Sequence, residues 1–408
     1  MSKRAVDIIS KIQSKCTDIF KKIDEIALYN QKKVLDAFRN NRISAAHLVG
    51  STGYGYSDIG RDSLAKVFAD VFHTEAAIVS PLIASGTHAL TISLFGLLRP
   101  NDVLLSVAGK PYDTLDDVIS GKNVGSLSDF GISFQSVELS DGKLNIPKIK
   151  EKISELQPKI VFLQRSQGYD WRLPISIREI AEIVTLTREL SPNSVVMVDN
   201  CYGEFTGCKE PTDVGADVII GSLIKNCGGG IAPTGAYIAG KSAFIEQIGY
   251  RLTASSVGTE IGSYIAGYLP YYEGLFLAPK TVASALKSNV LSGYVLEELG
   301  FETTPSAGTL PGDIIRAIKF NDEKKLTDFC IAIQAASPID SYLTPEAWDM
   351  PGYNHKVIMS AGTFVQGSSL EMTADAPIKP PYIGYLQGAL TYEHAVIALT
   401  EVVEKLIS

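Results

Sequence analysis

The sequence predicts an α/β protein with a mostly parallel central sheet, followed by a smaller α+β domain. In the middle of the chain, short apolar runs alternate with helical patterns, as strands and helices do in an α/β domain. Most runs are continuously apolar, which is expected when helices cover both faces of a sheet. After about residue 275 this alternation stops and shorter mixed segments follow.

The same patterns give the expected elements in chain order. Charges interleaved with apolar residues predict a helical N-terminal segment at 1–50, before a large domain at 51–275 and a small C-terminal domain at 276–408. The large domain should contain strands at 76–80, 103–107, 160–164, 195–199, 217–220 and 235–239. Helices are expected at 86–98, 146–156, 176–190, 280–299 and 391–406.

Composition narrows the class of protein. A chain of 408 residues with 45% hydrophobic residues can bury a large core, and its net charge of −8 argues against a nucleic-acid surface. The five cysteines include no CxxC pair, which favours reduced thiols and a cytoplasmic location. The most apolar region, 76–98, is interrupted by Pro81, Gly86 and His88, so we expect no membrane span. We expect no metal site.

Residues that directly follow the strands are the candidates for a ligand site, because ligands of open parallel sheets bind outside the carboxyl ends of the strands. Lys225 follows the strand expected at 217–220 and precedes three glycines, which let a backbone pass close to a ligand. Its apolar neighbours favour a desolvated amine with a lowered pKa, which would be nucleophilic. The alternative is a solvated surface lysine.

Asp199 ends the apolar strand at 195–199, where a carboxylate is costly unless it is paired. A suitable partner is the protonated ring nitrogen of pyridoxal 5′-phosphate (PLP), whose aldehyde would bind Lys225. The alternative partner is nearby backbone.

A candidate anion cradle opens the helix expected at 86–98. Ser85 is a good N-cap, Gly86 and Thr87 expose backbone amides, and the positive end of a helix suits a phosphate. Ser222 could add a hydroxyl to the same anion, and Tyr112 could stack on a flat heteroaromatic ring. Simple helix capping and loop packing are the alternatives.

Lys241 supports a different hypothesis. The string from Gly235 to Ser242 matches the phosphate-binding P-loop pattern, which would make the protein a nucleotide hydrolase. The four residues inside the match are apolar, however, and are typical of a strand rather than of a phosphate-wrapping loop.

Taken together, several stretches resemble one family. They are GYSDIGRD (55–62), IASGTHAL (83–90), GKPYDTLDDVI (109–119), VDNCYGEF (198–205), GSLIKNCGGGIAPTGAYIAG (221–240) and EMTADAPIKPPYIGYLQGALTYEH (371–394). In order and spacing they are similar to the fold-type-I PLP enzymes of cysteine and methionine metabolism, in the bacterial branch labelled methionine γ-lyase family or aluminium-resistance protein. The resemblance covers the chain from about Tyr54 to its end.

The resemblance implies the aspartate aminotransferase-like fold of PLP-dependent transferases and a role for each candidate. Lys225 would bind the cofactor aldehyde as a Schiff base, and Asp199 would pair with the ring nitrogen. Gly86, Thr87 and Ser222 would hold the phosphate, beside Ser85. Tyr112 would stack on the ring and protonate the leaving sulfur. Tyr56 would reach the neighbouring subunit's phosphate in a homodimer or homotetramer.

The implied activity is carbon–sulfur bond cleavage in an amino acid, of the methionine γ-lyase or cystathionine β-lyase type. An aminotransferase on the same fold would use the same lysine and aspartate. Relatives of the family carry a C-terminal arginine for the substrate carboxylate, whereas residues 371–383 of this chain offer only Lys379. Arg165 and Arg172 are the other candidate anion binders, since a lysine cannot make the same bidentate contact.

Overall fold

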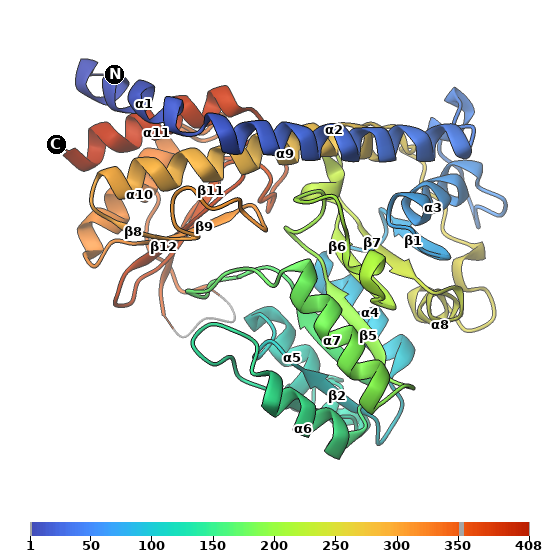
Figure 1. Ribbon diagram of the computed structural model, residues 1–408. Coiled ribbons are helices and arrows are strands. Elements are labelled where there is room, and N and C mark those ends of the chain that lie inside the picture. The colour runs from blue at the N-terminus through green and yellow to red at the C-terminus, as the bar shows by residue number, and fades with distance from the viewer. Residues whose placement is uncertain (1, 351–354, 408) are drawn as a thin grey trace.

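The computed structural model describes residues 2–350 and 355–407 and contains two sheets that lie side by side (Figure 1). The larger sheet has seven strands in the order β1-β7-β6-β5-β4-β2-β3. The strands are β1 (Ala76–Ser80), β2 (Val103–Ser106), β3 (Ser133–Ser136), β4 (Ile160–Gln164), β5 (Val195–Asp199), β6 (Val218–Ser222) and β7 (Ala236–Gly240). All neighbouring pairs are parallel except the two that β7 makes, with β1 and with β6.

Helices cover both faces of this sheet. Alternate residues of β4 point to opposite sides, so that Phe162 packs in one apolar cluster and Val161 in the other. The first cluster contains residues of α4 (Gly86–Leu97) and α8 (Ser242–Leu252). The second contains residues of α3 (Ile59–Val71), α6 (Ile146–Leu156) and α7 (Ile177–Leu190). This two-sided cover explains why β4 and its central neighbours are apolar at nearly every position.

The smaller sheet has five antiparallel strands in the order β10-β11-β12-β9-β8. They are β8 (Glu302–Thr304), β9 (Ile315–Lys319), β10 (Val357–Ser360), β11 (Thr373–Pro377) and β12 (Ile383–Gln387). Helices α10 (Glu323–Ala335) and α11 (Tyr392–Ile407) pack beside each other near this sheet (Figure 1).

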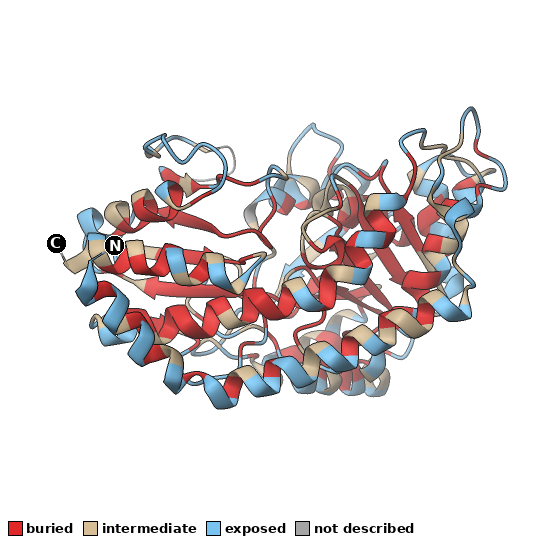
Figure 2. Ribbon diagram, turned by 90° about the horizontal axis from the view of Figure 1, so that it is seen from above, coloured by how far each residue is buried: buried red, intermediate tan, exposed pale blue. Residues whose placement is uncertain are grey.

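Three helices connect the two parts along one side of the molecule. Helix α1 (Lys3–Lys15) contacts α11, and α2 (Thr17–Asn40) runs along α9 (Leu269–Glu298) (Figure 1). Buried residues line both sheets and α9, whereas the outer sides of the N-terminal helices are exposed (Figure 2). The 1–50 segment therefore joins both cores.

The structure extends one predicted helix and adds a strand. Helix α9 begins at Leu269 rather than at 280, and it continues through Pro279, which is buried within it. A proline removes one helical hydrogen bond, but packing on the buried face compensates for that loss here. The domain boundary expected at residue 275 thus falls inside a helix. Strand β3 was absent from the prediction because its residues, Ser-Phe-Gln-Ser, are mostly polar.

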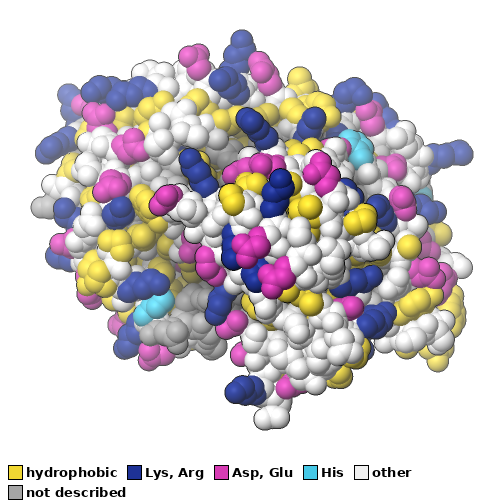
Figure 3. Space-filling model, turned by 60° about the horizontal axis from the view of Figure 1, so that its bottom comes forward, with side chains coloured by type: hydrophobic (Ala, Val, Ile, Leu, Met, Phe, Trp, Pro, Cys, Tyr) yellow, Lys and Arg dark blue, Asp and Glu magenta, His cyan; other side chains and the backbone are white. Residues whose placement is uncertain are grey.

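The remaining expected strands and helices of the large domain agree with the structure to within one or two residues at each end. All five cysteines are free thiols, and only Cys208 is exposed. Within residues 2–350 and 355–407, no helix is long and apolar enough to cross a membrane. On the face drawn in Figure 3, basic and acidic side chains are intermixed.

Candidate active site

A cavity of ≈ 870 Å³ lies at the carboxyl ends of the parallel strands, between the two sheets. Its lining includes most of the residues that the sequence singles out, namely Ser85, Gly86, Thr87, Tyr112, Arg172, Asp199, Ser222, Lys225 and Lys379. Residues 85 and 379 are almost 300 positions apart, so only the fold brings them together. This is the position that the strand-end rule predicts for a ligand.

Lys225 and Asp199 face this cavity from neighbouring parallel strands. Strand β5 ends at Asp199, and Lys225 follows the end of β6 by three residues. The Nζ atom of Lys225 lies 4.0 Å from the centre of the Tyr202 ring, and its side chain is only partly exposed. Asp199 is buried and accepts a hydrogen bond from the backbone N–H of Cys201 at 3.1 Å.

The charge of this pair differs from the sequence-based expectation. Burial alone lowers the pKa of Lys225, but Cys201, Tyr202 and Asp199 act against it, so that the pKa of Lys225 lies above its ordinary value. The predicted lowering of this pKa is therefore wrong for the protein by itself. Burial raises the pKa of Asp199, and the charge of Lys225 opposes that rise. The lysine is consequently an ammonium in the protein by itself, and Cys201, Tyr202 and Asp199 favour its charge.

The N-terminus of α4 forms another part of the wall. The Ser85 hydroxyl accepts a hydrogen bond from the backbone N–H of His88 at 3.0 Å, so Ser85 caps the helix as expected. Gly86 is open toward the cavity, since a side-chain carbon added there would stay 3.6 Å from Ser222 and 3.7 Å from the sulfur of Cys201. Backbone amides, a helix dipole and the Ser222 hydroxyl therefore converge on one anion-sized space.

Tyr112 is held in place from two directions. Its hydroxyl lies 2.9 Å from the hydroxyl of Thr87, and its backbone N–H donates to the side-chain oxygen of Gln164 at 3.0 Å. Burial, followed by the nearby Asp199 carboxyl, raises the pKa of Tyr112 well above its usual range. The phenol therefore keeps its proton and can act as a donor.

The glycines after Lys225 serve a different purpose from the predicted one. A side-chain carbon on Gly229 would lie 2.2 Å from the carbonyl oxygen of Gly274 in α9, and Gly229 has a φ of +60°. A carbon on Gly274 would in turn lie 2.3 Å from the carbonyl oxygen of Gly228. The close approach is thus between this loop and α9, and it fixes the backbone that carries Lys225.

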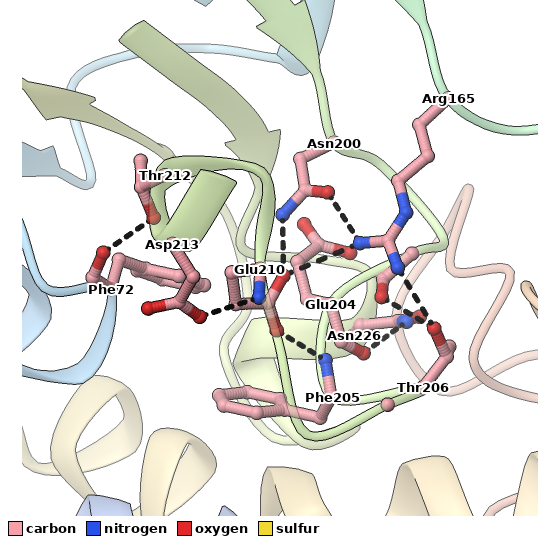
Figure 4. A network of polar contacts seen from close by, with 12 residues as sticks. Phe72, Arg165, Asn200, Glu204, Phe205, Thr206, Glu210, Thr212, Asp213 and Asn226 are labelled. Atoms are coloured by element: carbon pink, nitrogen blue, oxygen red, sulfur yellow. Dashed lines mark hydrogen bonds and ion pairs between the residues drawn. The ribbon is translucent and has the colours of Figure 1, made fainter. Parts of the chain in front are cut away.

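A buried polar network supports the segment that follows Asp199 (Figure 4). Arg165 donates to the side-chain oxygen of Asn200 at 2.8 Å and pairs with Glu210 at 3.3 Å. Glu210 also accepts from the amide of Asn200 at 3.1 Å and from the backbone N–H of Phe205 at 2.9 Å. The loop 200–210 is therefore fixed from its interior.

Two of the candidate anion binders thus differ in location. The Arg165 guanidinium is bonded inside the network and is absent from the cavity lining. Arg172 lines the cavity and is buried; its terminal nitrogens donate to the carbonyl oxygens of Leu173 at 3.0 Å and Ser166 at 2.5 Å. Its Nε makes no hydrogen bond within the described residues. Lys379 is exposed and lies on the cavity lining.

Tyr56 lies away from this cavity in a surface loop. Its side chain is 62% exposed, and its ring centre lies 5.5 Å from that of Tyr54, which is also exposed. Within one chain it therefore takes no part in the site.

The P-loop match around Lys241 has the wrong geometry for phosphate binding. Residues Ala236–Gly240 form strand β7, fully buried and paired on both sides, rather than a loop. Lys241 pairs with Asp217 at 2.6 Å, and neither residue belongs to the cavity lining. The nucleotide-hydrolase hypothesis has no structural support.

Several residues of the site were missing from the prediction, namely Cys201, Tyr202, Gln164, Tyr169 and Gln387. Cys201 and Tyr202 lie in the stretch VDNCYGEF, so their position after a strand end was a usable signal. Tyr202 has a φ of 71°, a left-handed conformation that is uncommon outside glycine and often found at functional sites. Gln387 lies in the small domain, and no local pattern marks it.

Comparison with known proteins gives a consistent result. Residues 5–407 match the model of the family described as methionine gamma-lyase. The uncharacterized protein YnbB of Bacillus subtilis is 46% identical over 401 residues, which cover 97% of this chain and 95% of that protein. A carbon-sulfur lyase involved in aluminum resistance from Clostridium novyi is 48% identical, with a TM-score of 0.96 over 100% of this chain and 97% of its own.

A more distant structure confirms the fold predicted from the resemblance. The pyridoxal-5′-phosphate-dependent protein YhfS of Escherichia coli superimposes with a TM-score of 0.61 at 17% identity, over 94% of this chain and 97% of its own. The PLP-dependent fold is therefore confirmed.

The cofactor of this chain is PLP, and the cavity fits it. The amine of Lys225 suits its aldehyde, and the amide-rich start of α4 with Ser222 suits its phosphate. Asp199 is a buried carboxyl. Among the described residues that affect its pKa, Lys225 is the only charged one. The Asp199 carboxyl suits a protonated ring nitrogen.

Proposed function

The chain belongs to the methionine gamma-lyase family, and from this membership we propose that it cleaves the carbon–sulfur bond of a sulfur-containing amino acid. It is a PLP-dependent enzyme of the lyase class. The observation that carries the proposal is the convergence of Lys225, Asp199, Tyr112 and the start of α4 on one cavity.

The proposal assigns a proton-transfer role to Lys225. When bound, PLP supplies an electron sink for the negative charge that develops at the substrate Cα. Asp199 would pair with the ring nitrogen and so give up its share, beside Cys201 and Tyr202, in raising the pKa of Lys225. The amine of Lys225 would then be available to take the proton from the substrate Cα.

Tyr112 supplies the second proton transfer. Its phenol keeps its proton because partial burial raises its pKa, and Thr87 and Gln164 orient it toward the cavity. It would donate that proton to the sulfur atom as the carbon–sulfur bond breaks. The products would be a thiol, a keto acid and ammonia.

Arg172 is the proposed partner of the substrate α-carboxylate. It is a buried cation on the cavity wall. Its Nε makes no hydrogen bond within the described residues and pairs only at 3.7 Å with the exposed carboxylate of Asp170. A charged donor without a full set of acceptors favours an anionic ligand. Lys379 lies on the same lining but is exposed, so its charge is more strongly screened.

We also propose a homodimer or homotetramer in which Tyr56 enters the site of the neighbouring subunit. The support is the exposure of Tyr56 and Tyr54, two aromatic side chains that contact each other in one surface loop. Large exposed aromatics of this kind favour an interface.

The test is product analysis of the PLP-loaded enzyme with L-cystathionine and L-methionine, without a keto-acid acceptor. We expect keto acid and ammonia in equal amounts from at least one of them, and no product from Lys225→Ala. A requirement for a keto-acid acceptor would instead indicate an aminotransferase.

A further inference from the structure

The small-domain wall of the cavity contains a carboxyl–amide pair that the proposed chemistry does not use. Gln387, the last residue of β12, lines the cavity, and Asp375 lies on the adjacent strand β11. The amide nitrogen of Gln387 donates to Oδ2 of Asp375 at 2.6 Å. The hydroxyl of Tyr169, from the large-domain loop after β4, donates to the same oxygen at 2.6 Å.

These contacts fix the orientation of the Gln387 amide. Because the nitrogen donates to Asp375, the carbonyl oxygen Oε1 is the free end of the amide. No hydrogen bond from the described residues reaches Oε1, although Gln387 is only 2% exposed. Gln387 is therefore a buried side chain that presents an unpaired acceptor on the cavity wall, with the Asp375 carboxyl directly behind it.

An acceptor backed by a carboxylate attracts a cation that can donate hydrogen bonds. Such a group in an amino-acid substrate is an ammonium, and the α-amine is already committed to the aldehyde of the cofactor. We propose that Gln387, oriented by Asp375, binds a second ammonium, carried on the sulfur-linked leaving group of the substrate. This inference rests on the proposed function and makes Gln387 the residue that distinguishes such substrates from those with an apolar leaving group.

The test compares two substrates that differ only at the relevant group. S-(2-aminoethyl)-L-cysteine carries an ammonium where S-propyl-L-cysteine carries a methyl group. For the PLP-loaded enzyme we expect kcat/KM to favour the aminoethyl compound on the order of 10- to 100-fold, as a hydrogen bond to a charged group implies. Both Gln387→Leu and Asp375→Asn should bring this ratio of kcat/KM values close to one, because they should lower kcat/KM only for the aminoethyl compound.

Gln387→Met provides a second variant, because a side chain of similar size that lacks both amide atoms should lower the ratio as Gln387→Leu does. Gln31→Leu, on α2 and outside the cavity lining, is the matched control and should leave the ratio unchanged. The proposal would be overturned if Gln387→Leu lowered kcat/KM equally for both substrates. It would also be overturned if neither Gln387 variant changed the ratio of the two kcat/KM values.

A binding measurement separates this inference from the proposed function. Calorimetry on PLP-loaded Lys225→Ala protein gives the affinity ratio of the two compounds without turnover. A preference for the aminoethyl compound that disappears in Lys225→Ala/Gln387→Leu supports the ammonium site even if the enzyme proves not to be a lyase. Equal affinities for both compounds in Lys225→Ala would refute it even if cleavage is observed.

Discussion

Two lysine–aspartate pairs lie in the same large sheet but at its opposite ends. Lys225 and Asp199 follow the carboxyl ends of β6 and β5, on the cavity. Lys241 follows β7, which runs antiparallel to β6, and therefore meets Asp217 at the other end, 2.6 Å away. The reversal of one strand thus separates two lysines that are only 16 positions apart.

The surroundings of the two pairs differ as well. Asp217 is buried but receives charged partners, Lys241 and Arg188, both at 2.6 Å, and Lys241 itself is 53% exposed. Burial dominates the pKa shift of Asp199, and no second cation is among the groups that affect that pKa. The ion pairs of Asp217 near solvent have a structural role. Lys225 and Asp199 face a cavity, where both groups remain able to bind a ligand.

The largest expected effect comes from removing the cavity lysine. Lys225→Ala should abolish turnover and the visible absorption of the bound cofactor, while circular dichroism shows an unchanged fold. Lys241→Ala is the matched control and should retain both. Activity in Lys225→Ala, or its loss in Lys241→Ala, would reverse the distinction between the two pairs.

Asp199→Asn should also lower kcat strongly, by ~10²-fold or more, because a fixed charge at the site of developing charge contributes on that order. The amide is nearly the same size, so the free energy of unfolding should change little. Steady-state kinetics together with urea denaturation distinguish the two effects. A variant with wild-type kcat would remove Asp199 from the mechanism.

The buried carboxyl Glu204, in the loop that follows Asp199, tests how strongly burial penalises a charge there. Burial raises its pKa from an ordinary 4.5 to about 8. The folded protein therefore holds a proton there that the unfolded chain has released, and the free energy of unfolding should fall as the pH rises from about 4.5 to about 8. The total fall should be a few kcal/mol, since one pKa unit corresponds to ~1.4 kcal/mol.

Glu204→Gln should flatten the pH dependence of the free energy of unfolding. Glu155→Gln, at an exposed position on α6, is the control and should not change it. Urea denaturation at several pH values measures both. An unchanged slope in Glu204→Gln would show that another group titrates in this range.

The smallest effect is expected at the structural pair. Asp217→Asn should destabilise the protein by about 1–3 kcal/mol, because two cations and the backbone N–H of Val196 lose a charged acceptor. Lys241→Ala should cost less than about 1 kcal/mol, since this lysine is exposed. Urea midpoints measure both values, and kcat should stay unchanged. A large loss of activity in either variant would contradict a purely structural role.

Much of the large domain was predictable because most of its strands are buried on both faces and so are almost continuously apolar. Lys225, Asp199 and Ser85 could be found because each directly follows a strand or caps a helix. Gln387 and the Asp375 carboxyl behind it could not, since Gln387 faces the cavity from another sheet and depends on how the two domains pack. The direction of the pKa shift of Lys225 also depended on neighbours that the sequence does not place around it.

The sequence by itself determined which segments form the sheet and which residues end its strands, because apolar periodicity and capping are local properties. The direction of β7, the role of the triple glycine against α9 and the second wall of the cavity were decided only by the tertiary structure. The physical reason is that burial, counter-charges and close backbone contacts arise between segments distant in the chain, and local patterns carry no information about which segments will meet.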